Sequence, residues 1–299
     1  MRVKSLKGHG AIRTVSIILV LVLIVLTASI SCQRQSSTSE KVGVAVTILP
    51  LVEFVKAVGG EKIDAFTMVP PGANPHAYEP VPSQIRKLAE AKMYVKVGAG
   101  LGFELAWMDK LAAVNRGMLV VDSSKGIELI ASKDPDEPGA DSHIWVSPLN
   151  AKTIVRNIYQ GLVQIDSKNE AYYSRNRDDY INKLDELDKD IKGRLKNVQN
   201  RQFIVFHPAW GYFARNYQLE QIPIEVQGKE PSAQDIARLV AHAKAQQIKV
   251  IFASPQFNPN SAEVIAREIG GKVVFIDQLA GDYMKNLRAV VEEMAQAME

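Results

Sequence analysis

A long amphipathic segment between residues 167 and 195, SKNEAYYSRNRDDYINKLDELDKDIKGRL, constrains the fold more than any other feature of the sequence. Its apolar residues recur at the spacings that place side chains on one face of a helix. They are Tyr173, Tyr180, Ile181, Leu184, Leu187, Ile191 and Leu195. Ser167 and Glu170 have the spacing of a capping box, in which each side chain satisfies a free amide of the first turn. The segment therefore predicts one helix of roughly 25 to 30 residues, about 40 Å long.

The sequence on both sides of this helix alternates short β-rich runs with helical ones. Runs such as VGVAVTIL, MYVKV and MLVVD precede it, and QFIVF, KVIFA and KVVFI follow it. This alternation is typical of βαβ units with parallel strands. Each side has enough strands for a core of its own in roughly 100 residues. We therefore predict an α/β fold of two lobes, each a mainly parallel sheet flanked by helices, bridged by the one long helix.

The N-terminus has the pattern of an export signal. Four basic residues precede an apolar run at 15–30, which is shorter than the about 20 residues that a membrane span needs. Cys32, the only cysteine, follows this run as it does in the lipobox of bacterial lipoproteins, which implies a lipid anchor on Cys32. Because Ser29 stands where that pattern usually has Leu, Val or Ile, an uncleaved membrane anchor is the alternative. Both interpretations place the protein outside the cytoplasm.

These patterns divide the chain into five expected segments. They are a lipoprotein signal peptide at 1–31, a flexible Ser-rich tether at 32–41, an N-terminal α/β lobe at 42–166, the linking helix at 167–197, and a C-terminal α/β lobe at 198–299. Without the four basic residues of the signal, the formal net charge of +3 becomes −1. This balance predicts no nucleic-acid partner.

Four side chains that can bind a metal follow directly after predicted strands. His76 lies in PPGANPHAYEP and His143 in DSHIWVSP, both before the long helix. His207 follows QFIVF, and Asp277 follows KVVFI, both after the long helix. Open α/β sheets bind their ligands beyond the carboxyl ends of the strands. If the two lobes face each other, three imidazoles and one carboxylate are therefore expected to converge.

The motifs that carry these residues resemble those of one family. GANPHAYEP, SHIWVSP, FHPAWGYFARNYQLEQIPIEVQGKEPSAQD and FIDQLAGDY are similar to motifs of the zinc/manganese-type solute-binding lipoproteins of bacterial ABC transporters (cluster A-I), and the similarity extends from about residue 42 to the end. The resemblance implies that His76, His143, His207 and Asp277 are the metal ligands, and that one helix bridges two α/β lobes. The chain departs at Ser142 and Gln278, where proline is common, and it lacks the His-rich insertion of many zinc-binding members.

The resemblance also implies a function. The expected protein is an extracytoplasmic, membrane-anchored receptor of the periplasm or cell surface, a monomer and not an enzyme. It captures a metal ion between its lobes and delivers it to a membrane permease driven by a separate ATPase. Imidazole ligands suit zinc, and manganese-preferring relatives commonly have glutamate in place of His207, so Zn²⁺ is the expected cargo. Mn²⁺ or Fe²⁺ is the alternative.

A secreted zinc-dependent hydrolase is the rival from another class. Three protein ligands and one water make a catalytic zinc site, and Glu79, three residues after His76, has a suitable place for a general base. If Asp277 is the fourth ligand, however, the ion has no position left for a reactive water. Glu79 is then expected to orient a ligand from outside the coordination sphere.

Overall fold

The computed structural model of the protein describes residues 41–132, 139–225 and 229–299. The expected signal peptide, Cys32 and all of the expected tether except Lys41 lie outside the described residues. Within the described ranges, no helix combines the length and the apolar character that a bilayer crossing requires.

Two four-stranded parallel sheets form the framework. The first has the order β2-β1-β3-β4 and the second the order β6-β5-β7-β8. The strands of the first sheet are β1 (Val42–Val46), β2 (Ile63–Thr67), β3 (Met93–Lys96) and β4 (Leu119–Asp122). Those of the second are β5 (Gln202–Val205), β6 (Glu220–Pro223), β7 (Val250–Ala253) and β8 (Lys272–Phe275). Every neighbouring pair is parallel, so the expected α/β fold with two mainly parallel sheets is confirmed.

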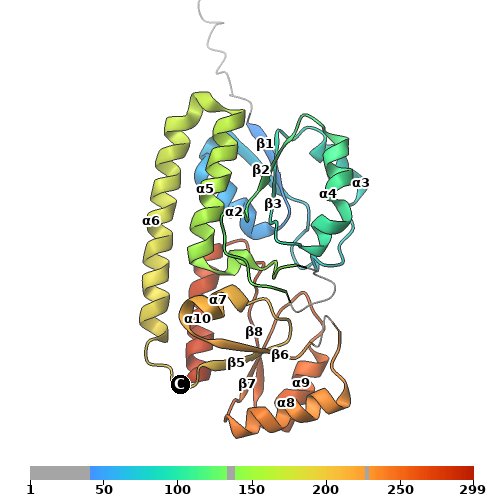
Figure 1. Cartoon of the computed structure of the whole chain (residues 1–299), viewed down its shortest axis with the longest axis vertical. Helices are drawn as coiled ribbons and strands as arrows, with labels where there is room; N and C mark the ends of the chain where they lie inside the picture. The colour runs from blue at the N-terminus through green and yellow to red at the C-terminus, as the bar shows by residue number, and fades with distance from the viewer. Residues whose placement is uncertain (1–40, 133–138, 226–228) are drawn as a thin grey trace, which may run out of the picture. The chain divides into compact units, whose positions relative to one another are not determined.

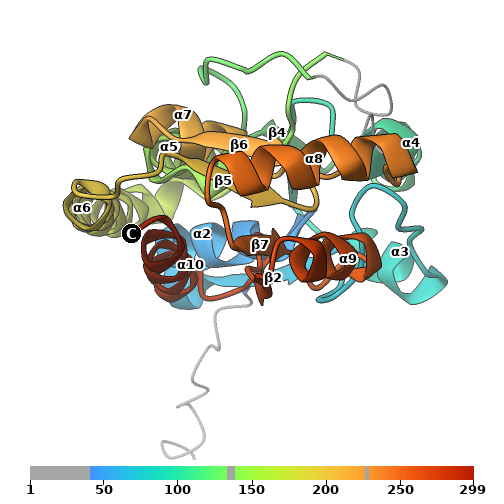
Figure 2. The same cartoon turned by 90° about the horizontal axis from the view of Figure 1, so that it is seen from below.

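Helices cover both faces of each sheet. The helices of the first half are α2 (Leu49–Gly59), α3 (Pro82–Leu88), α4 (Gly102–Val114) and α5 (Pro148–Ile165). The helices that follow the long helix are α7 (Gly211–Tyr217), α8 (Ala233–Ala245), α9 (Asn260–Glu268) and α10 (Tyr283–Met298). In Figures 1 and 2, α3 and α4 lie on the opposite side of the first sheet from α2 and α5. In the second sheet, α8 and α9 likewise lie opposite α10.

The predicted linking helix is α6 (Glu170–Leu195), which runs along both sheets in Figure 1. Its 26 residues give a length of about 39 Å at ~1.5 Å per residue. The helix packs against α2 and α5 of the first half and against α10 of the second. Six of the seven residues of the predicted apolar face are buried, and Ile181 is partly buried.

The predicted capping box at the start of this helix is wrong. Ser167–Asn169 forms a short 3-10 helix instead, and the N-cap residue, Asn169, makes no side-chain cap hydrogen bond. Asp166 organises this turn, because its Oδ2 accepts hydrogen bonds from Asn169 Nδ2 at 2.7 Å and from the Tyr173 hydroxyl at 2.6 Å. The hydrogen bond from Tyr173 to Asp166 thus replaces the capping box that the sequence spacing suggested.

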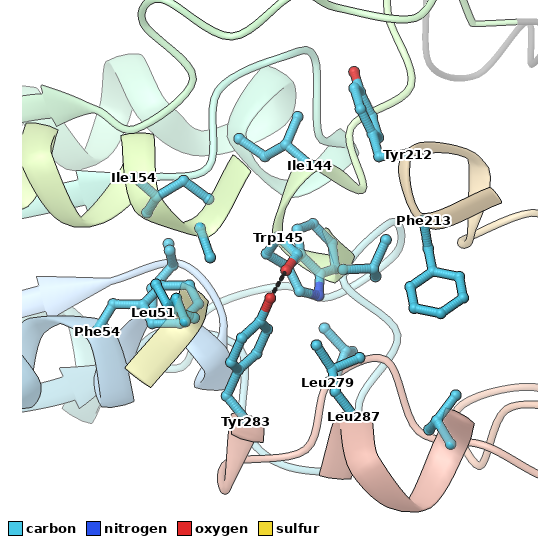
Figure 3. Close-up of a cluster of buried hydrophobic side chains, with 14 of the residues drawn as sticks. Leu51, Phe54, Ile144, Trp145, Ile154, Tyr212, Phe213, Leu279, Tyr283 and Leu287 are labelled. Carbon is cyan, nitrogen blue, oxygen red and sulfur yellow. Dashed lines mark hydrogen bonds between the residues drawn. The ribbon is translucent and has the colours of Figure 1, made fainter. Parts of the chain in front are cut away.

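The expectation of a separate core for each lobe is also wrong. One cluster of buried apolar residues begins on the first sheet, continues along α6 and ends on α10, so both sheets share it. Figure 3 shows its centre, where Trp145 lies between side chains of both halves of the chain. Smaller clusters fill the outer faces, one under α3 and α4 and one under α8 and α9. The two lobes have separate sheets but a common central core.

Polar contacts reinforce this joint. Trp145 Nε1 donates to the carbonyl of Gln278 at 2.7 Å, and the Tyr283 hydroxyl donates to the carbonyl of Trp145 at 2.8 Å (Figure 3). Glu53 of α2 accepts from the Tyr180 hydroxyl of α6 at 2.6 Å and from the Tyr283 amide of α10 at 2.5 Å. One carboxylate therefore connects the first lobe, the linking helix and the last helix.

Because the two lobes share a core, we expect them to unfold together. Leu184 is completely buried in the middle of α6, so Leu184→Ala leaves a cavity where both lobes pack. We expect the free energy of unfolding to fall by about 2–5 kcal/mol. Urea unfolding followed by both tryptophan fluorescence and circular dichroism should show one transition, shifted to lower urea.

Leu105 provides the matched control, because the same substitution on α4 removes a side chain of a residue that is 57% exposed. Leu105→Ala should change the free energy of unfolding by no more than about 0.5 kcal/mol. Two separated transitions, or equal losses in the two variants, would contradict a core shared by both lobes.

Candidate metal centre

Three histidines from both halves of the chain meet at the carboxyl ends of the strands. His76 lies in the loop after β2, and His143 immediately precedes a short 3-10 helix, Ile144–Val146, that leads into α5. His207 follows β5 by two residues. His143 and His207 are almost fully buried, with exposed fractions of 3% and 6%, whereas His76 is partly exposed. The cluster is therefore closed on the side of His143 and His207.

The three rings are close enough to share one ion. One ring nitrogen from each histidine lies within 4.8 Å of the others. The ring centroids are 5.5 Å apart for His76 and His143, and 5.0 Å apart for each of the other two pairs. Among the described residues, these three histidines are the one group of three or more potential metal ligands whose ligand atoms lie this close together.

Two carboxylates fix the orientation of two of these rings. His143 Nδ1 is 2.8 Å from Asp141 Oδ1, and His207 Nδ1 is 2.6 Å from Glu225 Oε2. An ionised carboxylate only accepts hydrogen bonds, so Nδ1 must carry the proton in both rings. In a neutral imidazole this leaves Nε2 with its lone pair unprotonated, ready to bind a metal ion.

Sheet register explains why Glu225 lies beside His207. Strands β5 and β6 pair in parallel with Val205 opposite Pro223, and the ladder continues through hydrogen bonds to Ile224 and Glu225. His207 and Glu225 each lie two residues beyond that last pair, so both side chains leave the same face of the sheet. The register of a neighbouring strand thus supplies the partner of His207.

The two unprotonated nitrogens face each other. His143 Nε2 and His207 Nε2 are 3.1 Å apart, and with both protons on Nδ1 no hydrogen lies between them. Two lone pairs at this distance repel each other unless a cation lies next to both. Ligand nitrogens bound tetrahedrally to zinc at ~2.05 Å are about 3.3 Å apart, so the observed separation suits one shared ion.

Burial favours the neutral state of His207. Desolvation, and then the nearby rings of His143 and His76, lower the pKa of His207 well below 6.5. Phe257 adds to this burial, because its ring stacks on His207 with centroids 4.4 Å apart and an interplanar angle of 21°. The ring is therefore uncharged at neutral pH, which is the form that binds metal.

The loop that carries His76 is held by the start of α4. The amide of Phe103 donates to the carbonyl of Pro75 at 3.0 Å, and Asn74 Oδ1 accepts from the amide of His76 at 2.9 Å. Gly102 lies so close to the loop that a Cβ atom there would be 3.0 Å from the carbonyl oxygen of His76. Glycine at this position therefore allows the helix to support the loop.

Asp277 and Glu79 lie outside the three-histidine group. Asp277 follows β8 by two residues, and its Oδ1 accepts from Gln256 Nε2 and from the amide of Leu279, each at 2.8 Å. Glu79 is exposed on the loop of His76. The roles of Asp277 as a ligand and of Glu79 as an orienting residue stay predictions.

The sequence motifs do not indicate the residues that contact the site histidines and Asp277. Asp141 is close in sequence, two positions before His143, and this spacing could have revealed it. Glu225, Gln256 and Phe257 come from loops after other strands, and their places depend on the pairing of β5 with β6 and β7. Cross-strand register, rather than any motif, brings them to the site.

Comparisons with known proteins support this assignment of the fold. The family model described as zinc-uptake complex component A, periplasmic (ZnuA) matches residues 44–297. The high-affinity zinc uptake system protein ZnuA of Bacillus subtilis (strain 168) is 32% identical over 82% of this chain and 81% of its own length.

Two further relatives extend the comparison. A crystal structure of ZnuA superposes with a TM-score of 0.83 and 39% identity, covering 87% of this chain and all of the other. The manganese ABC transporter substrate-binding lipoprotein PsaA of Streptococcus anginosus is 26% identical over 82% of this chain and 83% of its own length. Metal specificity therefore differs among proteins similar to this one.

Family membership decides between the two classes of function considered from the sequence. The matched family comprises solute-binding receptors, so the alternative of a secreted hydrolase is set aside. The match to the family model covers far more than half of the chain. This chain belongs to the family of periplasmic zinc-uptake components, the solute-binding receptors of metal ABC importers.

Proposed function

We propose that this protein captures Zn²⁺ outside the cytoplasm and delivers it to the permease of an ABC importer. The observation that carries the proposal is the pair of Nε2 atoms of His143 and His207, 3.1 Å apart, with each Nδ1 bonded to a carboxylate. Such an arrangement is stable when a cation binds between the nitrogens. His76 supplies the third nitrogen within the same 4.8 Å group.

Asp277 is the proposed fourth ligand. Its loop follows β8, which belongs to the same parallel sheet as β5, the strand before His207. Asp277 and His207 therefore both lie beyond the carboxyl ends of the strands of this sheet. Four protein ligands close the coordination shell of zinc, and such a site binds the ion without activating water. This donor set is suited to holding cargo.

Zinc is preferred over manganese because of the nitrogen content of the site. Three imidazoles and one carboxylate suit tetrahedral zinc, whereas manganese favours oxygen ligands and a larger coordination number. Mn²⁺ is the alternative cargo, and a manganese-binding lipoprotein among the relatives is the observation that keeps it under consideration.

The anchor and the partners complete the proposal. Cys32 would carry the lipid that holds the monomeric receptor at the membrane, where the permease and its ATPase would receive the ion. Labelling of cells with radioactive palmitate tests the anchor: the unmodified chain should incorporate the label, and Cys32→Ala should not. Absence of label from the unmodified chain, or equal labelling of both chains, would refute a lipid on Cys32.

The carboxylate beside His207 provides a first test of the metal site. Glu225→Ala removes the acceptor that holds Nδ1–H, so Nε2 of His207 loses its fixed orientation. Zinc affinity, measured by competition with a chromogenic chelator, should fall about 10–100-fold. Glu220→Ala is the control, because Glu220 is exposed and bonds Gln202 rather than a site histidine. Unchanged affinity in Glu225→Ala would exclude this orienting role.

The preference for zinc gives a second test. His207→Glu exchanges one nitrogen ligand for a carboxylate, and we expect the ratio of zinc to manganese affinity to fall about tenfold or more. His242→Glu is the control, since His242 lies on α8 and contacts Gln202. Competition titrations of the metal-free proteins measure both ions. Equal zinc and manganese affinity in the unmodified chain would overturn the choice of zinc.

A further inference from the structure

The loop after β7 contacts both of the proposed ligands from the second sheet. Phe257 stacks on the ring of His207, and the neighbouring Gln256 donates a hydrogen bond from Nε2 to Asp277 Oδ1 at 2.8 Å. Strand β7 lies between β5 and β8, so this loop is placed between the loops of His207 and Asp277. Two consecutive residues thus connect the imidazole and the carboxylate.

The chemistry of the two groups determines the orientation of the Gln256 amide. The Asp277 carboxylate can only accept a hydrogen bond, so the NH₂ group must face it. Gln256 Oε1 is buried, and the described residues provide no partner for it. Turning the amide over would place this oxygen against the carboxylate, where the two would repel. Gln256 is therefore held as a donor to Asp277.

The hydrogen bonds described for the Asp277 carboxylate both end on one oxygen. Oδ1 accepts from Gln256 Nε2 and from the amide of Leu279. The backbone of Asp277 is fixed as well, because its carbonyl accepts from Asn286 Nδ2 of α10 at 2.6 Å. Donors on Oδ1 compete with a metal ion for the lone pairs of that oxygen. Oδ2 is then the oxygen that remains for a metal.

We propose that Gln256 is a positioning residue that restricts Asp277 to coordination through one oxygen and thereby favours zinc over manganese. The proposal rests on the proposed function, in which Asp277 is the fourth ligand. Coordination through a single oxygen keeps the ion at four ligands, the number that zinc adopts in closed sites. Chelation through both oxygens would raise the coordination number, which suits a larger ion that prefers oxygen.

The test compares two variants with the same chemical change. Gln256→Met keeps the length of the side chain but removes the donor to Asp277. Gln246→Met is the control, because Gln246 is exposed at the end of α8. Zinc and manganese affinities of the metal-free chains are measured by competition titration, and thermal melting of the same samples checks folding.

The expected result is a change in selectivity. Gln256→Met should bind zinc about 10–100-fold more weakly, the range found when a group that orients a metal ligand is lost. Its manganese affinity should stay the same or rise, so the zinc-to-manganese ratio falls at least about tenfold. Cobalt(II) reports the geometry: the intense visible absorption of the tetrahedral ion should weaken in Gln256→Met and persist in Gln246→Met.

Each outcome decides one claim. If the unmodified chain binds zinc and Gln256→Met has the same zinc-to-manganese ratio and cobalt spectrum, the role of Gln256 is refuted while the proposed function stands. If the unmodified chain fails to bind zinc, the proposed function itself fails. Should Gln256→Met not fold, Gln256→Glu replaces it, because glutamate has the same shape and lacks the N–H donor; an unchanged ratio there also refutes the proposal.

Discussion

Two imidazole nitrogens that face each other without a proton between them are the constraint on which the site depends. Asp141 and Glu225 create it by holding the protons of His143 and His207 on the opposite ring nitrogens. Burial adds to it, because it lowers the pKa of His207 and so opposes relief of the repulsion by protonation. A divalent ion relieves the repulsion and gains two ligands. The ring orientations are therefore set before any ion arrives.

The packing between the lobes keeps this arrangement in place. The Tyr212 hydroxyl of α7 donates to the carbonyl of Asp141 at 2.8 Å, so the second lobe holds the residue that orients a histidine of the first. Trp145, two residues after His143, donates to the carbonyl of Gln278, directly after Asp277. The central core and the linking helix join both sheets over a large area. We therefore expect loop adjustments around a bound ion rather than a wide hinge motion.

The parts of this structure that depend on local pattern could be predicted from the sequence. The apolar face of α6 and the βαβ alternation follow from periodicity, and the histidines after strands follow from the rule that parallel sheets bind ligands at their carboxyl ends. The prediction of a capping box was wrong because Asp166 and Tyr173 form a competing hydrogen bond. The shared core could not be predicted, because a sequence pattern shows which residues are buried but not which element they are buried against. Gln256 was missed for the same reason, since its contact with Asp277 joins loops of neighbouring strands.

The most direct test of the three-histidine metal site is to locate the bound ion. A crystal structure of the zinc-loaded protein, with anomalous scattering measured on both sides of the zinc absorption edge, gives its position without assuming any ligand. We expect one zinc peak about 2.0–2.1 Å from a ring nitrogen of each of His76, His143 and His207. In His143 and His207 this nitrogen should be Nε2, with Asp141 and Glu225 still on Nδ1. A zinc peak at another place in the protein, or one within bonding distance of only one of these histidines, would contradict the proposed three-histidine site.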